Sequence, residues 1–452
     1  MNMHTDDSLK TLGSQDPGSA MLDFIAELYP ICRSITGEGV RETLRLVQKR
    51  IPLDIHEVAS GTQVFDWTVP LEWNIRDAYV KNRRGERVID FKVSNLHVVN
   101  YSQPIRKLMK LEELKPHLHA LHEHPDWVPY RTSYYKDNWG FCLSQKQLSQ
   151  MADEEYEVCI DSSLTQGALT YGECYLPGVS TDEVLISCHV CHPSLCNDNL
   201  SGMAVATFLA LNLAKQDRRY SYRLLFIPGT IGSITWLATH EQVIPRIKQG
   251  FVLTGVGDAG PLTYKRSRRG DAEIDRVMAQ VLKQAGKPYK LIDFFPYGYD
   301  ERQYCSPGFN LPVGCLMRTP HGEYPEYHTS ADSLDFIKPQ SLVGSLEHCL
   351  AVINVLEHNH RYMNQNPKCE PQLGKRGMYR AVAGHQAKQP QELVLLWVLN
   401  LSDGKHSLLD IAERADVPFA EVQSATAALV ECGLLAKCKE TVDHSQYGGC
   451  HE

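Results

Sequence analysis

The sequence predicts an α/β protein with a mixed sheet, a small inserted β-rich domain and a C-terminal helical domain. Between residues 155 and 340, apolar strand patterns alternate with helical patterns, which is typical of layered α/β folds. Between residues 60 and 140, short β-type runs are separated by Pro, Gly and Asn. Beyond residue 392 the pattern changes to three short amphipathic helices, which indicates a separate unit.

The individual elements follow from the spacing of apolar residues. Apolar positions three and four residues apart predict helices, whereas short runs of strand-forming residues bounded by turn residues predict strands. We expect helices that begin near residues 19 and 40, and further helices over residues 203–215 and 274–285. Strands are expected over residues 62–69, 87–93, 96–101, 184–187 and 223–227.

Composition and charge exclude several classes of protein. The 452 residues carry 46 basic and 54 acidic side chains, a net charge of −8, so a general nucleic-acid binder is not expected. No stretch of the sequence approaches the ~20 consecutive apolar residues that cross a bilayer. The N-terminal segment is polar and acidic and has no apolar core, so we expect a cytoplasmic protein. Its 14 cysteines are then expected to be reduced thiols.

The C-terminal pattern predicts a winged-helix-like domain over residues 375–441. A winged helix reads DNA through a basic helix, but residues 418–432 contain Glu421 and Glu431 and neither Lys nor Arg. We therefore expect no nucleic-acid partner and interpret this domain as a packing or dimerisation element. Start and stop signals bound its helices at Ser407, Pro418 and Gly433.

The densest site signal is the segment SCHVCHPSLCNDNLSG at residues 187–202, which follows a predicted strand and precedes a predicted helix. Loops at the carboxyl ends of strands are where α/β sheets place ligands. His189, His192 and Asp198 are suitable metal ligands. Three interpretations compete. They are a C-x-x-C-H haem attachment, which normally requires export, a thiolate zinc site, which needs a second Cys pair, and a hydrolytic metal site with His and Asp ligands.

A second segment, GEYPEYHTSADSLDFI at residues 322–337, supports the hydrolytic interpretation. Together, NDNLSG at residues 197–202 and HTSADSLD at residues 328–335 resemble two signatures of the co-catalytic zinc aminopeptidases. This superfamily includes bacterial leucyl aminopeptidase, glutamate carboxypeptidase and glutaminyl cyclase. The resemblance implies one or two Zn²⁺ ions, with Asp198 as the bridging ligand and His328 as a terminal ligand.

The resemblance also implies roles for residues between and before these signatures. His189 takes the role of the first His ligand, and His192 is either an alternative to it or a donor that orients it. Asp258, in a Gly-rich segment after a strand, resembles the later acidic ligand of the family. An Asp in such a segment is also a common turn former.

The chain further resembles a narrower group, the polysaccharide biosynthesis proteins with an aminopeptidase-like domain. The likeness includes YPICRSITGEG at residues 29–39 and TSYYKDNWGFC at residues 132–142. The group implies a zinc-aminopeptidase-like three-layer α/β domain with a mixed sheet, an inserted β-rich domain and a C-terminal winged helix. In this sequence the α/β domain would cover residues 19–60 and 132–365, and the insertion would cover residues 61–131.

Two departures from the aminopeptidase pattern affect the expected chemistry. The family places an Asp two residues after the first His, where this chain has Cys191. The family also carries a Glu-Glu pair after the next strand, where this chain has no carboxylate. Because the usual general base is missing, Glu301 and Glu326 are candidate replacements, unless each is a surface carboxylate. The alternative is a non-catalytic metal- or ligand-binding protein that retains the fold.

Four further side chains are candidates for substrate binding. Arg302 and Arg318 would hold a substrate carboxylate through paired hydrogen bonds, or they would form structural ion pairs. Tyr134 and Tyr135 would line a pocket or pack in the core. The basic run at residues 265–269 is interpreted as a solvated turn.

The sequence thus predicts a zinc-dependent, aminopeptidase-like hydrolase of an amide or peptide bond. A bound zinc ion would polarise the carbonyl group and lower the pKa of a water molecule. We expect a small-molecule or peptide substrate, with polysaccharide or natural-product biosynthesis as a context, and no membrane partner. Self-association into a homo-oligomer is left open.

Overall fold

A computed structural model describes residues 16–378 and 390–439 of the chain. The chain forms two compact units. Of the described residues, the first unit comprises 16–279 and 287–350, and the second comprises 280–286, 351–378 and 390–439. Among the described residues, none of the helices is long and apolar enough to cross a lipid bilayer. The cysteines within the described ranges are free thiols, in agreement with the expectation from the sequence.

An eight-stranded mixed sheet forms the centre of the first unit, in the order β1-β10-β12-β11-β13-β16-β14-β15. Strands β12, β11, β13 and β16 run parallel to one another. The pairs β1–β10, β10–β12 and β14–β16 are antiparallel, and β15 runs parallel to β14. Every residue of β11 and β12 is buried, because both faces of the sheet are covered. The strands are β1 (Asp54–Ala59), β10 (Ala168–Leu176), β11 (Glu183–His189), β12 (Ser221–Ile227), β13 (Ile247–Leu253), β14 (Leu262–Lys265), β15 (Tyr289–Ile292) and β16 (Val313–Met317).

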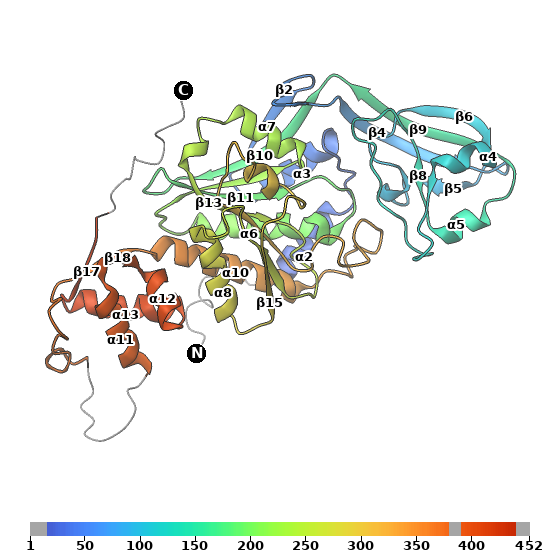
Figure 1. Ribbon diagram of the computed structural model, residues 1–452. Helices are drawn as coiled ribbons and strands as arrows, with labels where there is room; N and C mark the ends of the chain where they lie inside the picture. The colour runs from blue at the N-terminus through green and yellow to red at the C-terminus, as the bar shows by residue number, and fades with distance from the viewer. Residues whose placement is uncertain (1–15, 379–389, 440–452) are drawn as a thin grey trace. The chain divides into compact units, whose positions relative to one another are not determined.

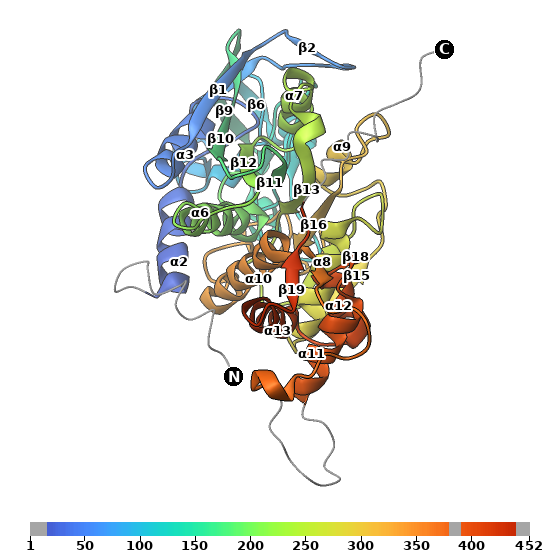
Figure 2. The same ribbon diagram turned by 90° about the vertical axis from the view of Figure 1, so that its left-hand side faces the viewer.

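Helices cover both faces of this sheet and complete the predicted three layers. Helix α2 (Pro17–Leu28) packs with α6 (Gly202–Leu213) on one face, and α7 (Ile231–Thr239) lies with α9 (Glu301–Tyr304) on the other (Figures 1 and 2). Nearly all of α6 is buried, which explains its continuous apolar sequence. Other helices of the chain are α3 (Glu38–Gln48), α8 (Glu273–Gln284) and α10 (Pro339–His358).

A second, four-stranded sheet in the order β5-β4-β9-β6 forms the β-rich part of the first unit. It extends beyond residue 131, because β9 (Glu155–Thr165) pairs with both β4 and β6. The strand predicted over residues 96–101 is wrong, since Ser94 caps a 3₁₀ helix, η2 (Asn95–His97), through its side chain. The remaining small elements are β2 (Gln63–Val64), β3 (Trp67–Thr68), β4 (Glu72–Lys81), β5 (Arg87–Asp90), β6 (Ile105–Lys110), α4 (Leu111–Leu114), β7 (Leu118–His119), β8 (Phe141–Cys142) and α5 (Gln145–Gln150).

In the described part of the second unit, helices α11, α12 and α13 accompany a three-stranded sheet in the order β18-β17-β19. Ser407 caps its central helix with a reciprocal capping box, as its position in the sequence predicts. The predicted winged-helix region includes residues 379–389 and 440–441, which lie outside the described residues. The elements are β17 (Arg361–Asn364), α11 (Pro390–Leu401), β18 (Asp403–Ser407), α12 (Leu408–Ala415), α13 (Phe419–Glu431) and β19 (Leu435–Lys437).

Candidate metal centre

The candidate site lies at the carboxyl end of β11, which ends at His189. Strand β11 runs between the parallel strands β12 and β13, and the carboxyl edge of parallel strands is the usual ligand-binding edge. The chain then turns through residues 190–201 before α6 begins at Gly202. All residues of this turn are buried, so their polar groups must find partners within the protein.

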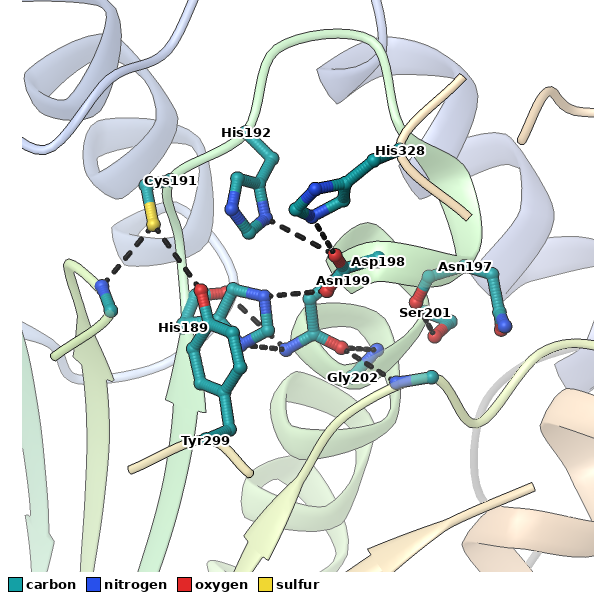
Figure 3. Close-up of polar contacts among 12 residues, drawn as sticks. His189, Cys191, His192, Asn197, Asp198, Asn199, Ser201, Gly202, Tyr299 and His328 are labelled. Atoms are coloured by element: carbon teal, nitrogen blue, oxygen red, sulfur yellow. Dashed lines mark hydrogen bonds and ion pairs between the residues drawn. The ribbon is translucent and has the colours of Figure 1, made fainter. Parts of the chain in front are cut away.

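The carboxylate of Asp198 is the centre of the site (Figure 3). Its Oδ1 lies 2.8 Å from Nε2 of His189, and its Oδ2 lies 3.0 Å from Nε2 of His328. Asp198 is fully buried, whereas the side chain of His328 is 34% exposed. The two imidazoles therefore contact opposite oxygens of one carboxylate. Because His328 is partly exposed, the site is open to solvent on its side.

His192 supplies a third imidazole from the same turn. Its Nδ1 lies 3.5 Å from Oδ2 of Asp198 and is a buried nitrogen without a hydrogen-bond partner. One ligand atom from each of His189, His192 and Asp198 lies within 4.8 Å of the others. An unpartnered buried nitrogen is costly, so its position beside two other ligand types indicates a place for a cation.

The charge states of these groups suit metal binding. Burial lowers the pKa of both His189 and His192, an effect that the nearby Asp198 only partly opposes, so both imidazoles are neutral at pH 7. Burial opposes ionisation of Asp198, but His192, His189 and His328 together hold its pKa well below the usual range. Neutral imidazoles and an ionised carboxylate are the forms that bind zinc. The donor set therefore fits a divalent cation.

Asp332 holds the turn that carries Asp198. Its carboxylate accepts hydrogen bonds from the backbone N–H groups of Asn197, at 2.6 Å, and Asp198, at 3.0 Å. Burial raises the pKa of Asp332 to about 7, although these N–H donors favour the ionised form. Asp332 thus fixes Asp198 through its backbone and leaves both side-chain oxygens of Asp198 for the imidazoles.

The Asp258 carboxylate bonds to Asn197 and to a neighbouring turn, and not to the imidazoles around Asp198. One of its oxygens accepts from the side-chain amide of Asn197 at 3.0 Å. The other accepts from the backbone N–H of Gly260 and the hydroxyl of Thr319, both at 2.7 Å. These bonds occupy the carboxylate, so the geometry supports the turn-forming interpretation of Asp258 and not the ligand role expected from the resemblance.

His328 is positioned by residues 128–130, which lie between β7 and β8 of the β-rich part. The backbone N–H of Tyr130 donates to the carbonyl oxygen of His328 at 2.8 Å, and Ser330 donates to Val128 at the same distance. The Tyr130 ring packs edge-on against His192 and His328, with ring centroids 5.2 and 5.1 Å apart. The β-rich part therefore contributes directly to the wall of the site.

The space at the end of β12, where the aminopeptidase pattern has its Glu pair, is filled by Tyr299 (Figure 3). The Tyr299 ring stacks on His189 with a centroid distance of 3.6 Å. A Cβ atom on Gly229 would lie 2.3 Å from the Tyr299 hydroxyl, so a larger residue at position 229 would force this ring to move. Cys191 accepts the Gly229 N–H at 3.2 Å. Burial raises the pKa of Tyr299 well above its usual value, so its hydroxyl stays protonated.

The two carboxylates predicted as general bases lie in different surroundings. Glu301 is fully buried, accepts from Lys265 Nζ at 2.8 Å and from the Tyr299 N–H at 3.0 Å. This pairing leaves Glu301 poorly placed to take a proton from water. Lys265 is itself 1% exposed, so the expected solvated turn is wrong at that residue. Glu326 is partly buried, and its backbone carbonyl holds the turn before His328 through Thr329.

The four side chains predicted to bind substrate also lie apart from one another, in different surroundings. Arg318 donates to the backbone carbonyls of Val256, Gly260 and Ser341, which supports a structural role. The Arg302 guanidinium lies 3.5 Å from the Thr230 hydroxyl. The Tyr134 hydroxyl lies 3.1 Å from that of Tyr130 and so reaches the wall of the site. Tyr135 is 50% exposed and packs edge-on against Trp67.

Sequence reasoning missed the aromatic wall of the site. Tyr327 stacks on His328 at 4.0 Å, and His321 lies 5.8 Å from both Tyr327 and Tyr299 by ring centroids. Tyr299 comes from a loop far from either signature, so no local signal marks it. The dense aromatic and His content of residues 321–328 is a signal that could have indicated His321 and Tyr327.

Comparison with known proteins agrees with the geometry. Residues 22–359 match the sequence family described as a domain of unknown function, DUF4910, and residues 360–437 match a winged helix-turn-helix family. A Clostridium acetobutylicum protein, provisionally assigned as a polysaccharide biosynthesis protein with an aminopeptidase-like domain, is 54% identical over 422 residues. That alignment covers 93% of this chain and 97% of the relative.

Solved structures give the same fold. A crystal structure from Clostridium acetobutylicum, provisionally assigned as a peptidase, matches with a TM-score of 0.91 and 52% identity, over 96% of this chain and 98% of that chain. A zinc aminopeptidase from Bacillus subtilis matches with a TM-score of 0.55 and 13% identity, over 75% of this chain and 95% of that one. A peptidase M28 precursor from Shewanella amazonensis matches with a TM-score of 0.55 and 12% identity, over 78% of this chain and 96% of that one. The aminopeptidase-like fold and the winged helix predicted from the motifs are therefore confirmed.

Proposed function

Because the chain belongs to the DUF4910 family and has an aminopeptidase-like fold, we propose that it is a metal-dependent hydrolase of an amide or peptide bond. The observation that carries this proposal is the buried Asp198 carboxylate, which two imidazole Nε2 atoms contact at 2.8 and 3.0 Å. A third imidazole, that of His192, has an unpartnered nitrogen beside it. The site thus combines one buried carboxylate with three imidazoles, a donor set that suits a divalent cation.

Zinc is the ion that we propose, held by Asp198, His189 and His328, with His192 as a further or alternative ligand. When bound, zinc supplies Lewis acidity, which polarises a carbonyl group and lowers the pKa of water. Asp198 brings the negative charge that balances the cation, and Asp332 keeps Asp198 in place through two backbone N–H groups. The partly exposed His328 leaves one side of the site accessible to a small substrate.

The neutral loop at the end of β12 favours one alternative, a protein that binds metal or ligand without hydrolysis. No carboxylate is present in residues 228–230, and Tyr299 fills the space beside them. The two proposals differ in whether the bound ion supports turnover, so they can be separated by experiment.

The decisive experiment combines metal content with a hydrolysis screen on the full chain. Protein purified without chelators is loaded with zinc and assayed with aminoacyl p-nitroanilides and N-acyl amides. We expect turnover that a chelator abolishes and added zinc restores. In His328→Ala, which loses a ligand at the accessible side, zinc content and turnover should both fall. Bound zinc without turnover of any substrate would favour the alternative. A chain that binds no zinc would contradict the zinc hydrolase and leave only the ligand-binding form of the alternative.

For the second unit we propose a packing or self-association role. Helix α13 carries Glu421 and Glu431 and has neither Lys nor Arg in its sequence, whereas phosphate contacts require basic side chains. A gel-shift titration of the full chain with duplex DNA at low salt should show no complex. A complex that weakens with added salt would contradict this proposal.

A further inference from the structure

A hydrolase needs a group that takes a proton from water and returns it to the leaving nitrogen. Around this site most carboxylates are already committed to other partners. Asp198 faces three imidazoles, Asp332 accepts two backbone N–H groups, and Glu301 is paired with Lys265. Asp258 is bonded to a neighbouring turn. Asp300 accepts the Thr230 N–H and the Ser233 hydroxyl through one oxygen, and its other oxygen is buried without a partner. The remaining candidates for the proton acceptor are therefore Asp300, the partly buried Glu326 and side chains of another kind.

His321 is an imidazole at the site to which neither the metal cluster nor the hydrogen bonds described above give a role. Its Nε2 is buried and has no hydrogen-bond partner. Its ring lies 5.8 Å from Tyr299 and 5.8 Å from Tyr327, and these two rings stack on His189 and His328 respectively. His321 thus adjoins both of the aromatic rings that stack on His189 and His328, and it is close enough to Asp198 for that charge to act on it.

We propose that His321 accepts the proton in hydrolysis, in place of the carboxylate pair that the loop after β12 lacks. This inference rests on the proposed hydrolytic function. In the first step an O–H bond of water breaks, its oxygen bonds to the carbonyl carbon and its proton moves to Nε2 of His321. In the second step the C–N bond breaks and the proton moves from Nε2 to the departing nitrogen. One water is consumed, and an acid and an amine are released.

The surroundings of His321 keep its imidazole neutral and ready to accept a proton. Burial is the main cause that lowers its pKa below the usual 6.5. Among the charged groups that act on it, Asp198 and Glu301 raise the pKa, whereas His328 and Lys265 lower it. A neutral imidazole with a free nitrogen is the form that a general base needs at pH 7.

The test compares His321→Gln and His321→Ala with the wild-type chain, all loaded with zinc and assayed on an amide that the wild type hydrolyses. We expect kcat to fall by about 10²–10⁴-fold in both variants, which is the usual loss of a general base. Zinc content, measured by elemental mass spectrometry, should stay at the wild-type level. Added imidazole should restore part of the turnover of His321→Ala, which a merely structural residue would not allow. His122→Gln, at an exposed position, is the matched control and should leave kcat unchanged.

Each of the following outcomes would overturn the inference that His321 accepts the proton. Wild-type kcat in His321→Gln would remove His321 from the reaction while leaving the proposed function intact. Loss of zinc from His321→Gln would make it a ligand or a support of one. Loss of turnover in Glu326→Gln, with full turnover in His321→Gln, would identify Glu326 as the proton acceptor. A wild-type chain that binds zinc but hydrolyses no substrate would instead overturn the proposed function, and the inference with it.

Discussion

The loops that follow β11 and β12 lie at the same edge of the sheet but differ in chemistry. The loop after β11, residues 190–201, is buried and presents a carboxylate surrounded by three imidazoles. The loop after β12, residues 228–230, carries no ionisable side chain and is packed against the Tyr299 ring. One edge of the sheet thus combines a carboxylate–imidazole cluster with an uncharged loop beside an aromatic ring.

If the proposed function holds, metal binding and proton transfer depend on separate parts of the site. The proposed ligands lie at and after the end of β11 and at His328, whereas the loop after β12 supplies no carboxylate and the proposed proton acceptor, His321, follows β16. The loop after β11, here called the ligand loop, is held by hydrogen bonds from its backbone N–H groups to Asp332. The loop after β12 is held by its contacts with Cys191 and Tyr299. Substitutions in the two loops should therefore have different effects.

The largest effect is expected at the ligand loop. Asp198→Ala removes the carboxylate that all three imidazoles face, so no negative charge remains to balance a cation. We expect zinc content to fall below about a tenth of the wild-type value by elemental mass spectrometry, since zinc sites depend on their ionised ligands. Asp335→Asn, an exposed acid in the same signature segment, should retain its zinc. Equal zinc in wild type and Asp198→Ala would contradict the ligand assignment.

A smaller effect is expected from Tyr299, which links the two loops. Tyr299→Ala removes the ring that stacks on His189 at 3.6 Å, so zinc affinity should fall by about 10–100-fold, as for other groups that orient a ligand. Tyr299→Phe keeps the ring and should bind zinc nearly as well as the wild type. Competition with a chromophoric chelator measures both affinities. An unchanged affinity in Tyr299→Ala would mean that the second loop does not support the first.

The next effect concerns stability and the loop after β12 alone. Gly229→Ala places a Cβ atom 2.3 Å from the Tyr299 hydroxyl, so the ring must move. We expect the free energy of unfolding to fall by about 1–3 kcal/mol, the usual cost of overpacking, in urea denaturation of the metal-free chain. The double variant Gly229→Ala with Tyr299→Phe should recover part of this loss. A fully stable Gly229→Ala would show that the loop accommodates the added methyl group.

The smallest effect is the pH dependence that Asp300 adds to the same loop. Burial raises the pKa of Asp300 from 3.8 to about 7, so the folded chain binds this proton more tightly than the unfolded chain. Its contribution to stability is therefore complete below pH 3.8 and declines as the pH rises to about 7. Asp300→Asn can still accept the Thr230 N–H at the same oxygen. Metal-free Asp300→Asn should lose less stability between pH 5 and pH 8 than the wild type, and identical slopes would contradict this.

The ligand loop could be predicted from the sequence because its residues are close together in the chain. His189, His192 and Asp198 fall within one turn between a predicted strand and a predicted helix, and the signature around His328 supplied the fourth member. The α/β layers were predicted for a similar reason, since buried parallel strands have continuous apolar sequences.

The second half of the site could not be predicted because it is assembled from distant segments. Tyr299 and Tyr130 reach the cluster only through the topology of the sheet and of the β-rich part. Lys265 lies in a basic run that reads as a solvated turn, yet its ion pair with Glu301 buries it. The pattern of a single sequence shows the local periodicity of its apolar residues. It does not show which charged residues, distant in the chain, contact one another in the fold.

The most direct test of the metal centre is anomalous diffraction from crystals of the zinc-loaded full chain, with data on both sides of the zinc absorption edge. We expect an anomalous peak among the Asp198 carboxylate and the imidazoles of His189 and His328. A matched crystal of Asp198→Ala should lack this peak. Zinc-loaded wild-type crystals with no peak beside Asp198, or with a peak only at a distant surface site, would contradict a zinc site at Asp198.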